Sequence, residues 1–308
     1  MENAKITLLT EKQATEQKKV QKYSFELEVF KKYGSKAVLS DFSIITGAFI
    51  ANPYIFDNNN IPDWTGWYWT KTIDTLWKKF DAVMVNEYTR RERVESRKVA
   101  NRPVLMLEEN DLNSISLNGE SLEPIEIEYG QYPQTIADRQ IAQTLEDCFY
   151  LGTLTETNKE YTIDSRKYDD YDKAFKPLQL KEYQYDGEKY VRVKINSHAN
   201  KESISLGEYV VLSDGEKYKN DTYVWVKVEP IKWIKEPLKN LFISKKCLFA
   251  GVRFNKYDET YDDSKFEETE INYYLQNYFA KDIVSTKINN YQDKDISITP
   301  IIVKKTKN

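Results

Sequence analysis

An aromatic segment and an arginine–proline segment constrain the fold of this chain more than any other part of its sequence. Residues 66–71 read GWYWTK, and residues 101–105, about thirty positions further on, read NRPVL. Tryptophan, tyrosine and valine favour strands. Successive strand side chains point to opposite faces, so Trp67 and Trp69 share one face and Tyr68 takes the other. Two such strands can close a small mixed domain, and we expect an α+β protein with mainly antiparallel sheets.

The composition excludes some classes of protein. The chain has 308 residues, of which 40% are hydrophobic and 14% aromatic. This supplies a core for one large domain or two smaller ones, so global disorder is not expected. Lys and Arg number 45 against 49 Asp and Glu, a net charge of -4. Nucleic-acid binders usually have a basic excess, so we interpret the basic residues at 90–98 as a solvated strand or turn and expect no general nucleic-acid ligand.

The termini and cysteines indicate the cellular setting. The first residues lack the apolar core of a signal peptide, and no apolar run approaches the roughly 18 residues of a membrane helix. Cys148 and Cys247 are far apart in the sequence and have no CxxC spacing. We therefore expect no membrane contact, no disulfide and no zinc site. A reducing cytoplasm, of a bacterium or an infected cell, or a virion fits this pattern.

Local signals predict the elements of the first half. Thr10 and Gln13 have capping-box spacing, which predicts a helix up to Tyr33 with Gly34 as its end. Ser40 is expected to cap a second helix, over 41–49. Strands are expected over these ranges: 5–9, 67–72, 82–88 and 99–107. The polar residues 108–124 read as a boundary.

The second half continues with a strand at 125–129 and a helix at 137–150, in which Ile141, Leu145 and Phe149 recur every four residues. Residues 152–180 read as a long loop or insertion. The pairs Asp186–Gly187 and Asp214–Gly215 predict hairpins. Further strands are expected at 222–233, 241–244 and 296–303. A capping box at 264–267 predicts a helix with three apolar residues on one face: Ile271, Leu275 and Phe279.

Short motifs in both halves match one known pattern. The second half contains GQYP at 130–133, PIKW at 230–233, LFIS at 241–244 and YLQNYF at 274–279; the first half contains LLTE at 8–11, GA at 47–48, WYW at 67–69 and RPVL at 102–105. On these motifs the chain resembles an uncharacterised bacterial and phage domain family, related in fold to the formylglycine-generating enzyme and C-type-lectin-like proteins.

The order of the motifs departs from that family. Residues 1–110 resemble the C-terminal part of the family module, 111–124 would be a linker, and 125–308 resemble the N-terminal part with an insertion near 152–222. The resemblance therefore implies a circular permutant, two incomplete modules, or subunits that complete one another.

Catalytic and metal chemistry have little support in the sequence. The only histidine, His198, lies in a polar loop, and neither cysteine matches the active-site cysteines of the formylglycine-generating enzyme. The acidic runs 169–172 and 258–263 lack the glycine typical of a calcium loop. No glycine-rich phosphate loop is present. We expect no catalytic residue, no metal and no cofactor.

The aromatic residues are the candidate site. Trp67 and Trp69 are interpreted as core residues, and Arg102 before Pro103 as a buried hydrogen-bonding fork; Trp233 belongs to the same structural motif. The binding hypothesis places four exposed aromatic residues against a partner, because aromatics dominate interface hot spots: Trp64, Tyr68, Trp77 and Tyr88.

The sequence thus favours a non-enzymatic protein that binds a macromolecule: a protein partner, with a glycan as the second candidate. The family resemblance implies a phage or mobile element and a host–virus interaction, either as a particle component or as an inhibitor of a host defence protein. One alternative is a hydrolase or other enzyme with a carboxylate and tyrosine site, for which the carboxylates are Asp41, Glu87, Glu126 and Asp138. A self-assembling homo-oligomer, in which the halves pair between chains, is another.

Overall fold

The fold is described here from a computed structural model. It covers residues 5–296 except 20–21, 51–63, 74–80, 87, 107–124, 167–172, 197–208, 238, 240, 257–264, 284–287 and 291–294.

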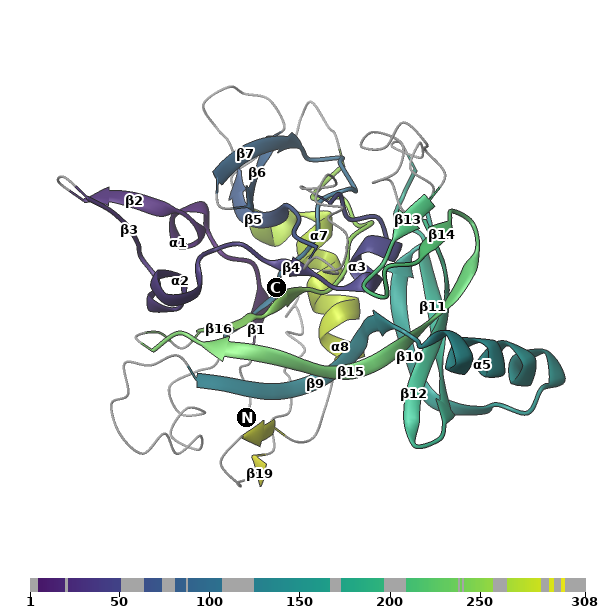
Figure 1. The fold of residues 1–308 in the computed structure, drawn as a ribbon. Coiled ribbons are helices and arrows are strands. Elements are labelled where there is room, and N and C mark those ends of the chain that lie inside the picture. The colour runs from purple at the N-terminus through teal and green to yellow at the C-terminus, as the bar shows by residue number, and fades with distance from the viewer. Residues whose placement is uncertain are drawn as a thin grey trace, which may run out of the picture.

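One long strand, β15 (Tyr223–Lys235), organises the main sheet (Figure 1). Along one edge it pairs with β9 (Ile125–Ile136). Along its other edge it pairs first with β12 (Glu188–Lys194) and then with β16 (Leu241–Ser244). All of these pairings are antiparallel, so β15 connects two wings of one sheet.

Each wing is completed by further strands. Beyond β12 lie β11 (Pro177–Tyr185) and β10 (Thr155–Asp164). Beyond β16 lie β8 (Val104–Met106) and β1 (Lys5–Thr7). Because β1 and β8 come from the first half of the chain and β16 from the second, both halves share this sheet. They also share one hydrophobic core, which includes Leu8, Trp69, Trp233 and Phe279.

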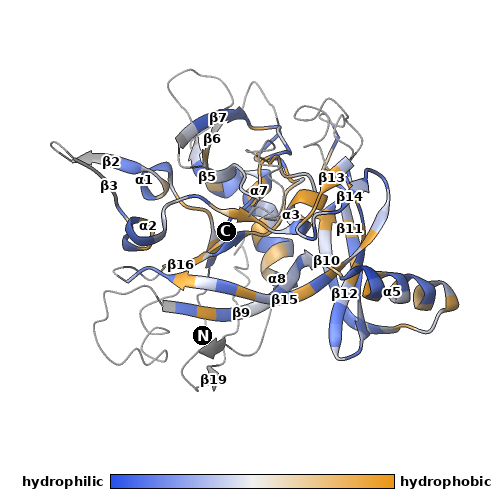
Figure 2. Cartoon of the chain, viewed as in Figure 1, coloured by the Kyte–Doolittle hydropathy of each residue, from blue (hydrophilic) through white to orange (hydrophobic). Residues whose placement is uncertain are grey.

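Helix α5 (Arg139–Leu151) covers the other face of β15. Asp138 caps the helix by accepting from the backbone of Gln140, and Gly152 ends it in a left-handed conformation. The buried Leu145 of the helix and Trp225 of β15 belong to a small second core. The predicted helix at 137–150 is therefore confirmed. Figure 2 shows that α5 is mostly hydrophilic but becomes hydrophobic at its C-terminal end.

The predicted long N-terminal helix is wrong in its middle. Thr10 forms the expected capping box, but α1 (Glu11–Ala14) is a single turn. A hairpin follows, of β2 (Glu16–Lys19) and β3 (Lys22–Phe25), before α2 (Glu28–Tyr33) ends at Gly34 as expected. Thr15, after α1, is already extended, so the helix ends after one turn.

The segment between these elements and β8 carries smaller elements. Ser40 caps α3 (Asp41–Ile45), as expected, although this helix is shorter than the range 41–49. β4 (Val38–Leu39) pairs in parallel with β17 (Lys246–Cys247). A separate antiparallel sheet contains β5 (Tyr68–Ile73), β6 (Asp81–Asn86) and β7 (Tyr88–Arg93).

The C-terminal helical region lies against the core. It runs from η1 (Phe266–Glu268) through α7 (Glu270–Tyr274) and the π-turn η2 (Leu275–Phe279) to α8 (Ala280–Asp282). Thr269 caps α7, whereas Ser264 lies outside the described residues. Ile271, Leu275 and Phe279 are all buried, as predicted. β18 (Ile288–Asn290) then pairs with β9 and with β19 (Asp295–Ile296); the rest of the predicted strand at 296–303 lies outside the described residues.

The long loop predicted at 152–180 is wrong, because β10 and the start of β11 occupy most of the described part of this range. β10 lies at the edge of the sheet, and the first half of the strand is largely exposed. Its sequence is consequently polar and lacks the apolar alternation of a buried strand. Both Asp-Gly pairs do form turns, between β11 and β12 and between β13 (Tyr209–Val211) and β14 (Lys217–Lys219). The α+β class is confirmed.

Candidate functional site

The first candidate site consists of the aromatic residues near β5. Trp64 is 5% exposed and Tyr68 is fully buried, so the expectation that both are exposed does not hold. The Tyr68 hydroxyl donates to the Ser35 carbonyl at 2.9 Å, and burial raises the pKa of Tyr68 to about 12. Other elements cover Tyr68 at the start of β5, and Trp64, which precedes this strand, is buried as well. Neither side chain is therefore available to a partner.

The remaining aromatic residues of that set have different positions. Trp69 is buried, with its ring centroid 5.4 Å from that of Phe254, and Trp67 is partly buried below the Arg90 guanidinium. Trp77 lies outside the described residues, and Tyr88 begins β7 with only its backbone described. The binding role of Trp77 and Tyr88 therefore stays a prediction.

Arg102 connects the two halves of the chain. Its Nε donates to the Ser244 carbonyl at 2.9 Å and its Nη1 to the Ser35 carbonyl at 3.1 Å. The guanidinium also lies over the rings of Phe30 and Tyr68. The backbone N–H of Ser244 donates to the Pro103 carbonyl. These contacts are those of a buried structural fork.

Trp233 has a comparable structural position. It is fully buried, and its Nε1 donates to the Tyr129 carbonyl at 2.8 Å. The indole thereby joins β15 to β9.

The carboxylates of the enzyme hypothesis have separate structural contacts. Asp41 is buried and accepts from the backbone N–H groups of Ile136 and Ser213, both at 2.8 Å. Burial raises the pKa of Asp41. Glu126 pairs with Lys245, and Asp138 caps α5, whereas Glu87 lies outside the described residues. No contact joins these described carboxylates into one site.

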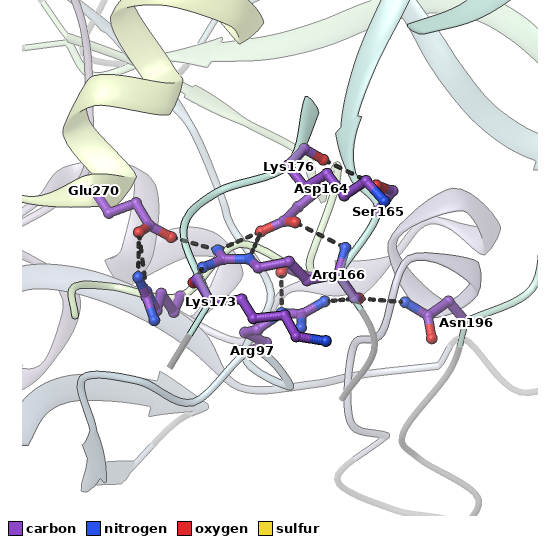
Figure 3. Close-up of polar contacts among 10 residues, drawn as sticks. Arg97, Asp164, Ser165, Arg166, Lys173, Lys176, Asn196 and Glu270 are labelled. Atoms are coloured by element: carbon purple, nitrogen blue, oxygen red, sulfur yellow. Dashed lines mark hydrogen bonds and ion pairs between the residues drawn. The ribbon is translucent and has the colours of Figure 1, made fainter. Parts of the chain in front are cut away.

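A buried cluster of charges lies beneath the C-terminal helices (Figure 3). Arg166 donates to Asp164 and to Glu270, which also accepts from Arg253 at 2.9 Å. Arg97 donates to the carbonyls of Gly251 and Arg166. All three arginines are at most 2% exposed. Their donors are directed at protein acceptors from four segments of the chain, which makes this cluster a structural crosslink.

Metal chemistry gains no support from the described part of the chain, in which no three His, Cys, Asp or Glu side chains are grouped to hold an ion. Cys247 is buried, which raises its pKa to about 12, and Cys148 is partly buried on α5. Within the same residues no helix is long and apolar enough to cross a membrane.

An open groove lies between α5 and the strands β14 and β15, and we call it the α5 groove. Its volume is ≈ 500 Å³. Aromatic and charged side chains both line the groove, among them Arg139, Glu146, Lys217, Tyr218, Tyr223 and Trp225. A mixture of aromatic and polar groups is typical of binding sites.

One arginine beside the groove holds two of the residues that line it, Glu146 and Tyr223. Arg192 of β12 donates from Nε and Nη2 to the two carboxylate oxygens of Glu146, at 3.0 and 2.6 Å. The same carboxylate accepts from Trp225 Nε1 at 2.8 Å. The Arg192 bond is the largest of the effects that lower the pKa of Glu146. The Arg192 guanidinium also lies 3.9 Å from the ring centroid of Tyr223 and 4.8 Å from that of Phe149.

The aromatic residues next to Arg192 remain accessible. Tyr223 is 53% exposed and Tyr150, at the end of α5, is 74% exposed. Leu151 follows it with 75% exposed. A fixed arginine between exposed tyrosines has the composition of an interface hot spot, which is enriched in Tyr, Trp and Arg.

A sequence signal for this surface did exist. The strand 222–233 alternates between valines and a second set of residues, Tyr223, Trp225 and Lys227. The valines enter the main core, and the other set faces α5 or solvent. Arg192 and Glu146 could not be paired from sequence, because they lie on different elements.

No family model, no curated protein and no solved structure matches this chain.

Proposed function

We propose that this chain is a non-enzymatic binding protein that contacts a protein partner through the α5 groove. The observation that carries the proposal is Arg192, which is held by Glu146 and lies against the ring of the exposed Tyr223. Arginine and tyrosine supply large contact areas and hydrogen bonds at the same position.

These side chains are already held in fixed positions before a partner binds, which supports the same role. Arg192 is fixed by two hydrogen bonds and stacked rings, and Glu146 is fixed in addition by Trp225. Binding costs free energy whenever rotamer-rich side chains must be immobilised, at about 0.5–1.5 kcal/mol each. A surface that is already ordered avoids most of this cost.

The biological setting that we propose follows the family resemblance. A permuted lectin-like module of a phage or mobile element would act by contact, as a particle component or as an inhibitor of a host defence protein. The pairing of β8 with both β1 and β16 supports a single module that joins the two halves. Arg97 supports it further, because this first-half side chain donates to the carbonyls of Gly251 and Arg166 in the second half.

Two substitutions test the proposal, one of the groove residue Tyr223 and one of Tyr150, its exposed neighbour across Arg192. Wild-type chain and the variants Tyr150→Ala and Tyr223→Ala are immobilised and incubated with lysate of the source cells, and captured proteins are identified by mass spectrometry. Loss of a hot-spot side chain costs about 2 kcal/mol or more. We expect the partner bound by wild type to be lost from both variants.

The matched control is Tyr33→Ala. Tyr33 is 50% exposed on α2, which lies on the opposite side of the molecule from α5 (Figure 1). This variant should retain the partner. Retention by all three variants, each with an unchanged circular dichroism spectrum, would place the contact elsewhere. Recovery of small molecules alone would favour an enzyme, and recovery of the chain itself would favour self-assembly.

A further inference from the structure

The α5 groove contains three cations that the fold does not use. Arg139 begins α5, and Lys217 and Lys219 are the two ends of β14. All three side chains are exposed, and none forms a hydrogen bond or ion pair with another described residue. Glu216 is the one carboxylate lining the groove that is not already bound to an arginine.

Other cations on this wing are paired. Lys194 lies 2.9 Å from Asp221, and Lys227 lies 3.0 Å from Glu188. Arg192 is bound by Glu146. Exposed cations on neighbouring strands are thus matched by local carboxylates, whereas those of the groove are not. Three unpaired cations therefore gather in one groove of a chain whose net charge is -4.

Arg139 is also unfavourable for the helix that carries it. The N-terminal end of a helix has a partial positive charge, so a cation in its first turn costs up to about 1 kcal/mol. The cap carboxylate of Asp138 offsets part of this cost, but the first turn of α5 itself contains no acidic residue. Helix stability therefore does not explain the choice of arginine at this position.

We infer that the occupant of the α5 groove is an acidic segment of a partner protein, a conclusion that rests on the binding function proposed above. Its carboxylates meet Arg139, Lys217 and Lys219, and its apolar or aromatic side chains contact Tyr223 in the groove and the exposed Tyr150 next to Arg192. Opposite charges steer such a segment to the groove and align it there. A nucleic acid would present phosphates to the same cations, but nucleic-acid binders usually have a basic excess and this chain has a net charge of -4.

Fluorescence anisotropy tests the charge of the occupant. The probes are a labelled peptide of repeated Glu-Glu-Tyr units, a Lys-Lys-Tyr peptide of equal length and labelled oligothymidylate. We expect the acidic peptide to bind the full chain most tightly, and its affinity to fall as salt screens the contact. Equal anisotropy for the two peptides, or tighter binding of the basic peptide or of oligothymidylate, would overturn the inference.

Charge reversal tests the named residues. The double variant Lys217→Glu/Lys219→Glu should bind the acidic peptide about tenfold or more weakly. The control, Lys5→Glu/Lys232→Glu, makes the same change of charge at exposed lysines outside the groove and should bind like wild type. Equal weakening in both double variants would show that net charge alone is responsible, and would overturn the inference.

The two proposals fail in different ways. If Tyr150→Ala and Tyr223→Ala lose the cellular partner but Lys217→Glu/Lys219→Glu retains it, the groove is a binding surface and its occupant is not acidic. If none of these variants loses the partner, the binding function of the groove fails as well.

Discussion

At the scale of single residues, the buried carboxylate of Asp282 has a pKa that is shifted toward neutral pH. Its Oδ2 accepts from the backbone N–H of Thr162 at 2.6 Å, which joins α8 to the edge strand β10. Burial raises its pKa from 3.8 to about 7, although the hydrogen bond from Thr162 and the charge of Lys159 act in the opposite direction. Glu160, on the same strand, raises this pKa further.

The raised pKa fixes the sign of a pH effect on stability. Above about pH 4 the unfolded chain loses the Asp282 proton, whereas the folded chain keeps it until about pH 7. The folded state then binds more protons, so the free energy of unfolding falls as pH rises through this window. We expect Asp282→Asn to reduce this fall, measured by urea denaturation at about pH 5 and about pH 8.

Asp147→Asn is the control for this experiment, because Asp147 is an exposed carboxylate on α5. It should leave the wild-type pH dependence in place. Asp41, whose pKa burial also raises, contributes in the same direction, so a residual slope is expected in Asp282→Asn. An unchanged slope in that variant would show that Asp282 titrates normally in the folded protein.

At the scale of elements, local signals were sufficient where a helix or turn is determined by its own residues. Thr10 and Ser40 cap helices as their spacing predicts, and Asp186–Gly187 forms the turn of a hairpin. Prediction from the sequence failed where contacts with a distant element determine the local structure. The backbone N–H groups of Glu28 and Val29, at the start of α2, donate to the distant Glu236 carboxylate, which no local pattern reveals.

The burial of Tyr68 is the same kind of failure. Alternation along a strand predicts which residues share a face, but it does not predict that other elements cover both faces. Arg192 and the groove residues Glu146 and Tyr223 come from three elements, so their contacts could not be predicted from sequence, and only the alternation that includes Tyr223 was visible there. Candidate core residues were therefore easier to predict than the candidate site.

Two glycines allow the cost of a left-handed backbone to be compared with the cost of a steric clash. Gly251 has φ +83, and a Cβ there would lie 2.5 Å from the Thr46 carbonyl oxygen; Gly152 has φ +67 with nothing within 4 Å. Alanine at either position costs about 1–2 kcal/mol for the left-handed conformation. We expect Gly251→Ala to lower the free energy of unfolding by about 2 kcal/mol more than Gly152→Ala, since overpacking adds its own cost. Equal urea midpoints in the two variants would show that the backbone at Thr46 moves away freely.

At the scale of the whole molecule, stability and binding are assigned to two different arginines. Arg166 joins Asp164 at the end of β10 to Glu270 of α7, and its carbonyl accepts from Arg97 in the first half of the chain. Burial acts to lower the pKa of Arg166, but its bonds to Asp164 and Glu270 raise it overall. Arg192 instead contacts Glu146 and Tyr223, which line the α5 groove, and 14% of its side chain is exposed.

Replacing each arginine by methionine should therefore have opposite consequences. Arg166→Met leaves Asp164 buried without its partner, and removal of one member of a buried pair costs about 3–5 kcal/mol. Arg192→Met leaves Glu146 with the Trp225 indole and with access to water, so its cost to folding should be about 1 kcal/mol or less. Urea denaturation measures the first quantity, and anisotropy with the Glu-Glu-Tyr peptide measures the binding that Arg192→Met should lose. Normal peptide binding by Arg192→Met would remove the observation on which the proposed function depends. A small stability loss in Arg166→Met would show that Asp164 and Glu270 do not depend on this guanidinium when they are buried.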